Sequence, residues 1–228
     1  MKTMVIVGAG KRLGMSLARQ FGKEGFQIAL IARNEEKLLF MKSQLSHDGI
    51  ESSYYPADIY DRNQLSRAFQ NIYQKYGSID ILEFSPTAGH HQPVPVLELK
   101  PGDAEDAIIG NVLAAIQCVN EVLPSMLKNK AGALLFTTGL SAIYPNPQMA
   151  DSSIAKAGLR SYIANLESEL TPKHIFVGHI SLGIFLKENS KDISNPDNVA
   201  RVWYEKYVNN QYGEELYPEG VTPETVIR

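Results

Sequence analysis

The feature that most constrains the fold of this chain is a glycine-rich turn near its amino terminus. Residues 4–14 read Met-Val-Ile-Val-Gly-Ala-Gly-Lys-Arg-Leu-Gly, an apolar run that leads through glycines into a segment with helical periodicity. Gly8, Gly10 and Gly14 allow a tight turn and a close approach of the backbone to a ligand. Because the first amides of a helix favour an anion, the segment predicts a strand, a turn and a helix that together bind a dinucleotide diphosphate.

The rest of the chain alternates short apolar runs with longer amphipathic segments, which predicts an α/β fold. We expect strands at 4–8, 27–32, 52–56, 80–84, 132–137 and 175–181, and a short strand near Glu215–Tyr217. Helices are expected between the strands, with Asp61 as the N-cap of the third helix and a last helix over 197–210. Repeated strand–helix alternation predicts one doubly wound parallel sheet with helices on both faces. We expect a single domain over residues 1–220 and a loose tail over 221–228.

The end of the second strand indicates which dinucleotide binds. An acidic residue there would bond the ribose hydroxyls of NAD, but the strand ends in Ala32 followed by Arg33. A guanidinium suits a 2′-phosphate by charge and by bidentate geometry, and Lys11 and Arg12 add two cations in the turn. We therefore expect NADP(H) to be preferred over NAD(H). The alternatives are that the turn is only structural and that Arg33 is a solvated loop residue.

Composition excludes several other classes of protein. The 228 residues are 44% hydrophobic and 21% charged, and the net charge of −3 provides no basic field for nucleic acid. Cys118 is the single cysteine, which suits a reducing compartment. We find neither a targeting segment nor an apolar run of about 18–20 residues, so we expect a cytoplasmic protein that does not enter a membrane. We expect no metal in the site.

Over residues 4–220 the chain resembles the classical short-chain dehydrogenase/reductase family, which has a Rossmann-type fold. The turn Gly8-Ala9-Gly10-Lys11-Arg12-Leu13-Gly14 looks like the family's Gly-x-x-x-Gly-x-Gly with arginine in place of the middle glycine, and it is similar to the Lys-Arg-Leu-Gly turn of pteridine reductases. The resemblance implies that Gly8, Gly10, Lys11, Arg12, Leu13 and Gly14 surround the diphosphate. It also implies that Asp58, followed by Ile59, bonds the adenine amine, that Asn111 holds a water of the proton relay, and that Lys156 bonds the nicotinamide ribose.

The chain departs from the family where proton transfer occurs. Counting back from Lys156 and forward from Gly132 without a gap places Ser152 at the position of the catalytic tyrosine and Gly139 at that of the catalytic serine. The family's Asn-Asn-Ala-Gly falls at Phe84–Thr87, and its Pro-Gly after the sixth strand is Leu182-Gly183, with Lys187 in place of the usual threonine.

These losses weaken the predicted chemistry without removing the cofactor site. A serine hydroxyl is a much weaker acid than a tyrosine tuned by a lysine, and Gly139 offers no hydroxyl to polarise a carbonyl. Ser152 either replaces the acid poorly or serves as the N-cap of the fifth helix. Lys156 either binds ribose or is a solvated helix lysine.

Several residues can substitute for the missing acid, and each is also interpretable as an ordinary loop or strand residue. They are Tyr144, in the loop before the Lys156 helix, Thr138 and Ser141 beside Gly139, and His90 and His91 after the fourth strand. Glu83 is unusual within an apolar strand. It is expected either to face the site from a strand end or to pair with a cation.

Three hypotheses follow for the function. The first is an NADP(H)-dependent oxidoreductase with altered acid–base residues, acting on a small carbonyl or alcohol or on a quinone-like acceptor, beside a polar loop at 184–197. The second is a catalytically inactive NADP(H)-binding sensor or regulatory protein, and the third is a structural partner that retains only the fold. The resemblance and the surplus of apolar residues over 103–127 also predict a homodimer or homotetramer built on helices 103–127 and 152–170.

Overall fold

The computed structural model describes residues 1–86, 92–222 and 224 and contains one seven-stranded sheet. The strands are β1 Thr3–Val7, β2 Gln27–Ala32, β3 Ser52–Pro56, β4 Ile81–Phe84, β5 Gly132–Gly139, β6 Ile175–Leu182 and β7 Glu214–Tyr217. All pairs are parallel, in the order β3-β2-β1-β4-β5-β6-β7. The predicted doubly wound parallel sheet is therefore confirmed, and the chain reverses its winding direction between β1 and β4.

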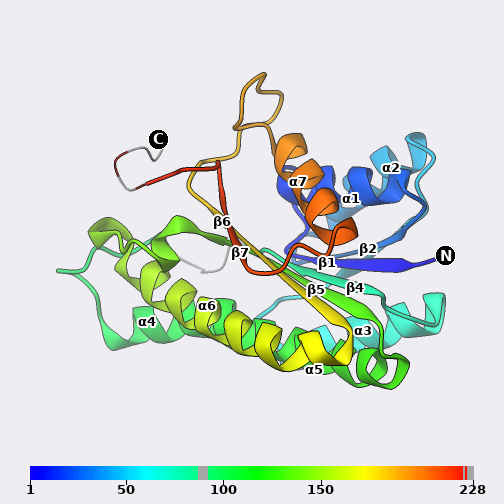
Figure 1. Ribbon diagram of the computed structural model, residues 1–228, viewed down its shortest axis with the longest axis horizontal. Helices are drawn as coiled ribbons and strands as arrows, with labels where there is room; N and C mark the ends of the chain where they lie inside the picture. Colours follow the sequence, from blue (N-terminus) through cyan, green and yellow to red (C-terminus); the bar gives the residue numbers. More distant parts are fainter. Residues whose placement is uncertain (87–91, 223, 225–228) are drawn as a thin grey trace.

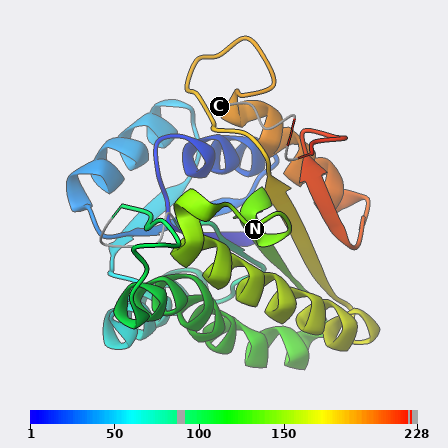
Figure 2. The ribbon, with the colours of Figure 1, turned by 90° about the vertical axis from the view of Figure 1, so that its left-hand side faces the viewer.

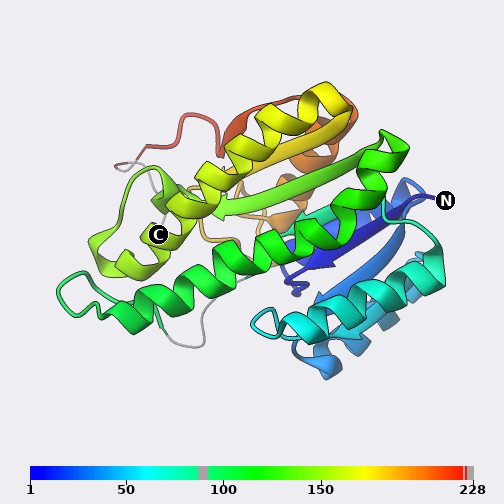
Figure 3. The same cartoon turned by 90° about the horizontal axis from the view of Figure 1, so that it is seen from below.

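Helices cover both faces of this sheet (Figure 1). They are α1 Leu13–Lys23, α2 Glu35–His47, α3 Arg62–Tyr76, α4 Pro101–Ile108, α5 Ala114–Asn129, α6 Ala150–Leu170 and α7 Pro196–Val208. One layer consists of α1, α2 and α7, and the other of α3, α5 and α6, as the view from below shows (Figure 3). Because the central strands are buried on both faces, their residues alternate between two apolar cores, as Val5 and Val7 do with Ile6.

Local capping explains where several helices begin. The Asp61 carboxylate accepts hydrogen bonds from the amides of Asn63 (2.9 Å) and Gln64 (3.1 Å), which confirms it as the N-cap of α3. The Asn34 side chain caps α2 by accepting from the Lys37 amide at 2.8 Å. These two helices start shortly after the carboxyl ends of β2 and β3, on the side of the sheet where ligands bind in folds of this topology.

The longest helical segment runs without interruption over Pro101–Asn129, through α4, a π-helical turn at Ile109–Leu113 and α5. By length and composition it could cross a membrane, although no apolar run of that length was expected from the sequence. Its residues Cys118, Val119 and Val122 are fully buried against the sheet. The core helix of a globular protein can have the same length and apolar composition as a membrane span. The packing of this segment against the sheet identifies it as a core helix.

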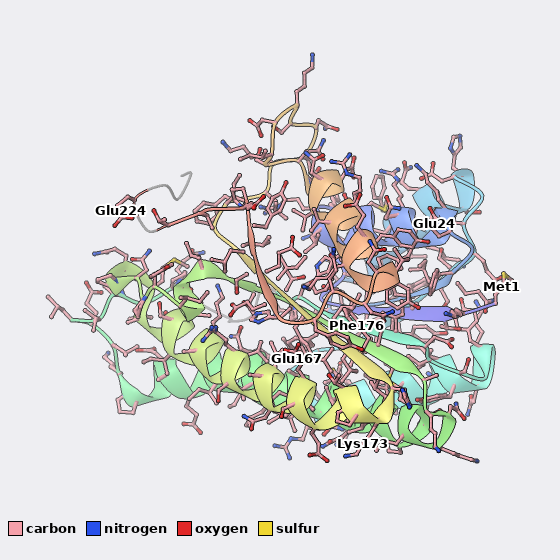
Figure 4. All side chains as sticks on the ribbon, in the orientation of Figure 1. Met1, Glu24, Glu167, Lys173, Phe176 and Glu224 are labelled. Carbon is pink, nitrogen blue, oxygen red and sulfur yellow. The ribbon has the colours of Figure 1, made fainter. Side chains whose placement is uncertain are left out.

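Aromatic side chains pack near the amino end of β6, beside α7 (Figure 4). Phe176, near the amino end of β6, packs against the rings of Tyr207 and Tyr212. Glu24, just after α1, accepts a hydrogen bond from the Tyr204 hydroxyl of α7 at 3.1 Å, so an exposed hydrogen bond joins these two helices. The carboxyl ends of the strands carry loops instead, and Figure 2 looks toward them.

Candidate active site

The glycine turn between β1 and α1 is fixed by its neighbours. Gly8 has a φ of +88°, a conformation that favours glycine, and a methyl group there would overlap the Cα of Pro86. The amides of Gly8 and Ala9 both donate to the carbonyl of Ile31, at 2.9 and 3.0 Å, which ties the turn to β2. Gly10 has no such constraint, because a methyl group there would approach only the Gly8 carbonyl oxygen, at 3.8 Å.

The turn leaves backbone donors available for a ligand. Within the described part of the chain, the amides of Lys11 and Arg12 have no hydrogen-bond acceptor. Helix α1 starts at Leu13, and its N-cap Arg12 forms no side-chain cap. Unpaired amides at a helix start, beside an open glycine, suit the diphosphate of a dinucleotide.

The three cations of the predicted phosphate site have different environments. Arg33 is exposed directly after β2 and forms no ion pair with any described residue. The Lys11 ammonium lies 5.0 Å from the centre of the Phe40 ring on α2. Arg12 Nη1 donates to the carbonyl of Leu186 at 3.3 Å and so links the turn to the loop after β6.

The end of β3 holds the residues predicted to contact adenine. Asp58 is half-buried, and its carboxylate accepts a hydrogen bond from the Tyr60 amide at 3.1 Å. The Asp58 amide donates to Gln64 Oε1 at 3.0 Å, which fixes the backbone at this position. Ile59 is buried, so it anchors the segment rather than projecting from it.

Helix α6 carries Ser152 and Lys156. The expectation that Ser152 caps this helix is wrong, because α6 begins at Ala150 with Met149 as its N-cap. A 3₁₀ turn at Pro147–Met149, capped by Asn146, leads directly into α6 and leaves Ser152 inside the first helical turn. One helical turn further on, Lys156 reaches the end of β5, where its Nζ lies 3.1 Å from the position that a Cβ would take on Gly139.

Asn111 lies in the π-helical turn, buried between α4 and α5. Its Nδ2 donates to the Ala107 carbonyl at 2.8 Å, four residues earlier in the chain. The bond orients the side chain and leaves Oδ1 without a protein donor among the described residues. Oδ1 is therefore available to accept a hydrogen bond from the relay water that the resemblance to the family implies.

The candidates for a substitute acid lie in different places. Tyr144 is 40% exposed on the loop between β5 and α6, and Ser141 is half-buried in the same loop. His90 and His91 lie outside the described residues. Thr138 is buried beneath α6, with its Oγ1 2.8 Å from His179 Nε2 and 2.9 Å from Ser181 Oγ. Because these contacts occupy its hydroxyl, Thr138 does not replace the serine lost at Gly139.

The network around Thr138 was not anticipated from the sequence. Ser181 donates to Glu214 Oε1 at 2.6 Å, and Arg160 on α6 donates to the other carboxylate oxygen at 2.6 Å. Burial lowers the pKa of His179 to about 4, so its ring is neutral near pH 7. His179 and Ser181 alternate on one face of a strand, which was the available signal, but their partner Glu214 comes from β7 and was not identifiable.

Glu83 is fully buried in β4 and faces α7 rather than the candidate site. Ser85 Oγ donates to Glu83 Oε2 at 3.0 Å and Thr137 Oγ1 to Oε1 at 3.2 Å, while Trp203 Nε1 donates to Thr137 Oγ1 at 3.0 Å. No described cation pairs with it, so the expected strand-end or ion-pair role is wrong. Burial raises the pKa of Glu83 to about 8, which keeps the carboxyl protonated at neutral pH.

Two later segments follow the carboxyl ends of β6 and β7 (Figure 2). The loop between β6 and α7 is organised by Asp192, which accepts from the Ser194 amide at 2.8 Å. Val221, the first residue of the expected tail, is buried, and a methyl group on Gly183 would lie 2.5 Å from its Cγ2. The chain after β7 thus packs over the end of β6.

Comparison with known proteins decides the family. A family model described as short chain dehydrogenase matches residues 2–198. The chain belongs to this family of oxidoreductases. The 3-oxoacyl-(acyl-carrier-protein) reductase FabG of Staphylococcus epidermidis is 23% identical over 215 residues, which cover 94% of this chain and 86% of that protein.

Solved structures of short-chain dehydrogenases share the fold. A hydroxysteroid dehydrogenase from Escherichia coli superposes with a TM-score of 0.84 at 22% identity, covering 96% of each chain. A metagenomic short-chain oxidoreductase in complex with NADP gives a TM-score of 0.81 at 21% identity, covering 94% of this chain and 96% of that chain. At these identities the likeness establishes the architecture, and the chemistry depends on the residues of the site.

Proposed function

We propose that this short-chain dehydrogenase is an NADP(H)-dependent oxidoreductase that acts without the family's tyrosine and serine. The observation that carries the proposal is an open glycine turn with unpaired amides, followed at the end of β2 by the exposed Arg33. At the end of β5, Lys156 lies against Gly139. The substrate class is a small carbonyl or alcohol, or a quinone-like acceptor that takes hydride with little acid assistance.

The residues present fit a nicotinamide dinucleotide. The Lys11 and Arg12 amides and Gly10 would hold the diphosphate, Arg33 a 2′-phosphate, Asp58 the adenine and Lys156 the nicotinamide ribose. When bound, the cofactor supplies or accepts the hydride. The protein contributes orientation through the fixed turn, and Asn111 Oδ1 can hold a water between helix and site.

The first prediction concerns cofactor choice. We expect the protein to bind NADPH at least about tenfold more tightly than NADH, because a charge-assisted phosphate contact contributes about 1.5–3 kcal/mol. Arg33→Ala should weaken NADPH binding by about tenfold and leave NADH binding unchanged. Titration calorimetry measures both affinities, with Arg67→Ala, an exposed arginine on α3, as the control. Equal affinities in the natural protein would contradict the assignment.

The second prediction concerns turnover. Simple ketones should be reduced slowly. A positioned proton donor normally raises the rate about 10²–10⁴-fold, and the hydroxyls of the family's tyrosine and serine are both missing. NADPH oxidation measured across aldehydes, ketones and quinones tests the proposed function. We expect quinones or activated carbonyls to be the best acceptors. Tight NADPH binding without turnover of any acceptor would instead favour the second candidate, a catalytically inactive sensor. The observation that supports this candidate is the replacement of the family's serine and tyrosine by Gly139 and Ser152.

We also propose self-association through the π-helical turn and α6. Leu113 and Ile154 are 37% and 46% exposed on these two elements. The elements are in contact, since a methyl group on Gly158 would lie 3.4 Å from Val112 Cγ2. An exposed apolar surface formed by neighbouring helices is typical of an interface between copies, and a dimer or tetramer would cover it.

A reducing compartment suits the single cysteine, and we place the protein in the cytoplasm. Cys118 is buried in α5, and burial raises the pKa of its thiol. A buried thiol of this kind is inert and serves as a small apolar side chain in the core.

A further inference from the structure

The position of the Lys156 ammonium has a consequence for the proton donor. Nζ lies 3.1 Å from where a Cβ would project from Gly139, and the carbonyl oxygen of Leu182 is 3.7 Å from the same point. Glycine at 139 therefore leaves room for the ammonium at the end of β5, in the place from which a serine hydroxyl would project. Within the described residues Lys156 makes no hydrogen bond or ion pair, so its N–H groups are available.

Among the described residues, Ser152, Thr138 and Tyr144 are less well placed as acids. Ser152 is too weak an acid, Thr138 is engaged with His179 and Ser181, and the Tyr144 phenol is on an exposed loop. In the family that this chain belongs to, the lysine acts through a tyrosine, which this chain lacks. In this chain the lysine ammonium itself lies at the end of β5, beside Gly139, where the family's serine would stand.

We propose that Lys156 is the proton donor, giving its proton directly to the substrate oxygen. This inference rests on the proposed function, with a reduced nicotinamide dinucleotide as the reductant. As the hydride pair forms the new C–H bond, the carbonyl π pair moves to oxygen. A Lys156 N–H bond breaks and an O–H bond forms. The carbonyl is reduced to an alcohol, the nicotinamide is oxidised, and the neutral amine regains its proton from water.

The surroundings of Lys156 favour this role. Burial lowers the pKa of Lys156, while the nearby Asp151 carboxylate on the same helix raises it, and burial is the larger effect. Gly139 lies beside the ammonium, and the Leu182 carbonyl oxygen lies 3.7 Å from the Cβ position of Gly139; neither group titrates. A lowered pKa makes the ammonium a stronger acid near neutral pH, where general acids work best.

The decisive variant is Lys156→Arg, which keeps the positive charge and the ribose donors but does not release a proton at usable pH. We expect reduction of a carbonyl acceptor to fall at least about 100-fold, with NADPH affinity by calorimetry within threefold of the natural protein. In Lys156→Ala at saturating NADPH, added ethylammonium should restore part of the rate. Lys173→Arg, in the 3₁₀ turn Thr171–Lys173 that follows α6, is the matched control and should leave the rate unchanged.

A second readout needs neither cofactor nor turnover. Lysine labelled with ¹³C at Cε gives a titration curve for Lys156, assigned by its loss in Lys156→Arg. We expect its pKa below the ordinary 10.5, and Gly139→Ser should return the pKa toward that value by displacing the ammonium.

The outcomes separate this inference from the proposed function. If the natural protein reduces an acceptor and Lys156→Arg does so at a comparable rate, the inference is overturned and the proposed function stands. An ordinary lysine pKa together with no ethylammonium rescue also overturns it. If the natural protein binds NADPH but turns over no acceptor, both fail together.

Discussion

Glu83→Gln is expected to make the protein more stable than the natural chain above pH 8 and to remove much of the pH dependence of its unfolding free energy. The carboxyl is fully buried, and its pKa is raised to about 8 from the ordinary 4.5. A glutamine of nearly the same shape keeps hydrogen-bonding groups for Ser85 and Thr137. It carries no charge at any pH.

The direction follows from proton binding. Between pH 4.5 and pH 8 the folded protein holds a proton on Glu83 that the unfolded chain has released. The stability contributed by this group is therefore fully present below pH 4.5 and is lost as the pH rises through about 8. With each pKa unit worth about 1.4 kcal/mol, the loss is on the order of 5 kcal/mol.

Urea unfolding of both proteins at pH 5, 7 and 9 measures this effect. At pH 5 the free energies of unfolding should agree within about 2 kcal/mol, because the substitution replaces one buried carboxyl group with one buried amide. At pH 9 the glutamine variant should be several kcal/mol more stable. Glu205→Gln, on the exposed face of α7, should follow the natural protein at each pH. Parallel curves for Glu83→Gln and the natural chain would show that Glu83 is ionised in the fold.

Gly8→Ala is expected to lose both stability and nucleotide binding. The added methyl group would overlap the Pro86 backbone, and the φ of +88° is strained for alanine. We expect a loss of roughly 2–4 kcal/mol in the free energy of unfolding, from the left-handed strain and the overpacking together. Since the turn must move, the amides of Lys11 and Arg12 also shift, and NADPH affinity should fall at least about tenfold.

Gly10→Ala is the matched control for this experiment. Its methyl group would meet only the Gly8 carbonyl oxygen, at 3.8 Å, so the free energy of unfolding should change by less than about 1 kcal/mol. NADPH binding should still weaken, because the methyl group would fill the space that a diphosphate approaches. Equal stability of the two variants, measured by urea unfolding, would show that the close contact of Gly8 with Pro86 does not constrain the turn.

The sequence by itself determined the architecture, because the strands, the helices and the glycine turn depend on local patterns. Buried strands read as short apolar runs, and α3 begins beside Asp61 because an aspartate side chain bonds the amides two and three residues later. The positions of Gly139, Ser152 and Lys156 could likewise be counted along the chain, so the absence of the tyrosine and the serine follows from the order of residues alone.

Only the tertiary structure decided what the side chains contact. Glu83 meets Thr137 from a neighbouring strand, and Thr138 turns toward His179 and Ser181, contacts between positions 54, 41 and 43 residues apart. The approach of Lys156 to Gly139 depends on how α6 lies across the end of β5. Periodicity specifies which face of an element is apolar, but it does not specify which strand lies beside it or how far a flexible lysine extends. Those partners are set by packing between segments distant in sequence, and that packing determines which acid is available to the site.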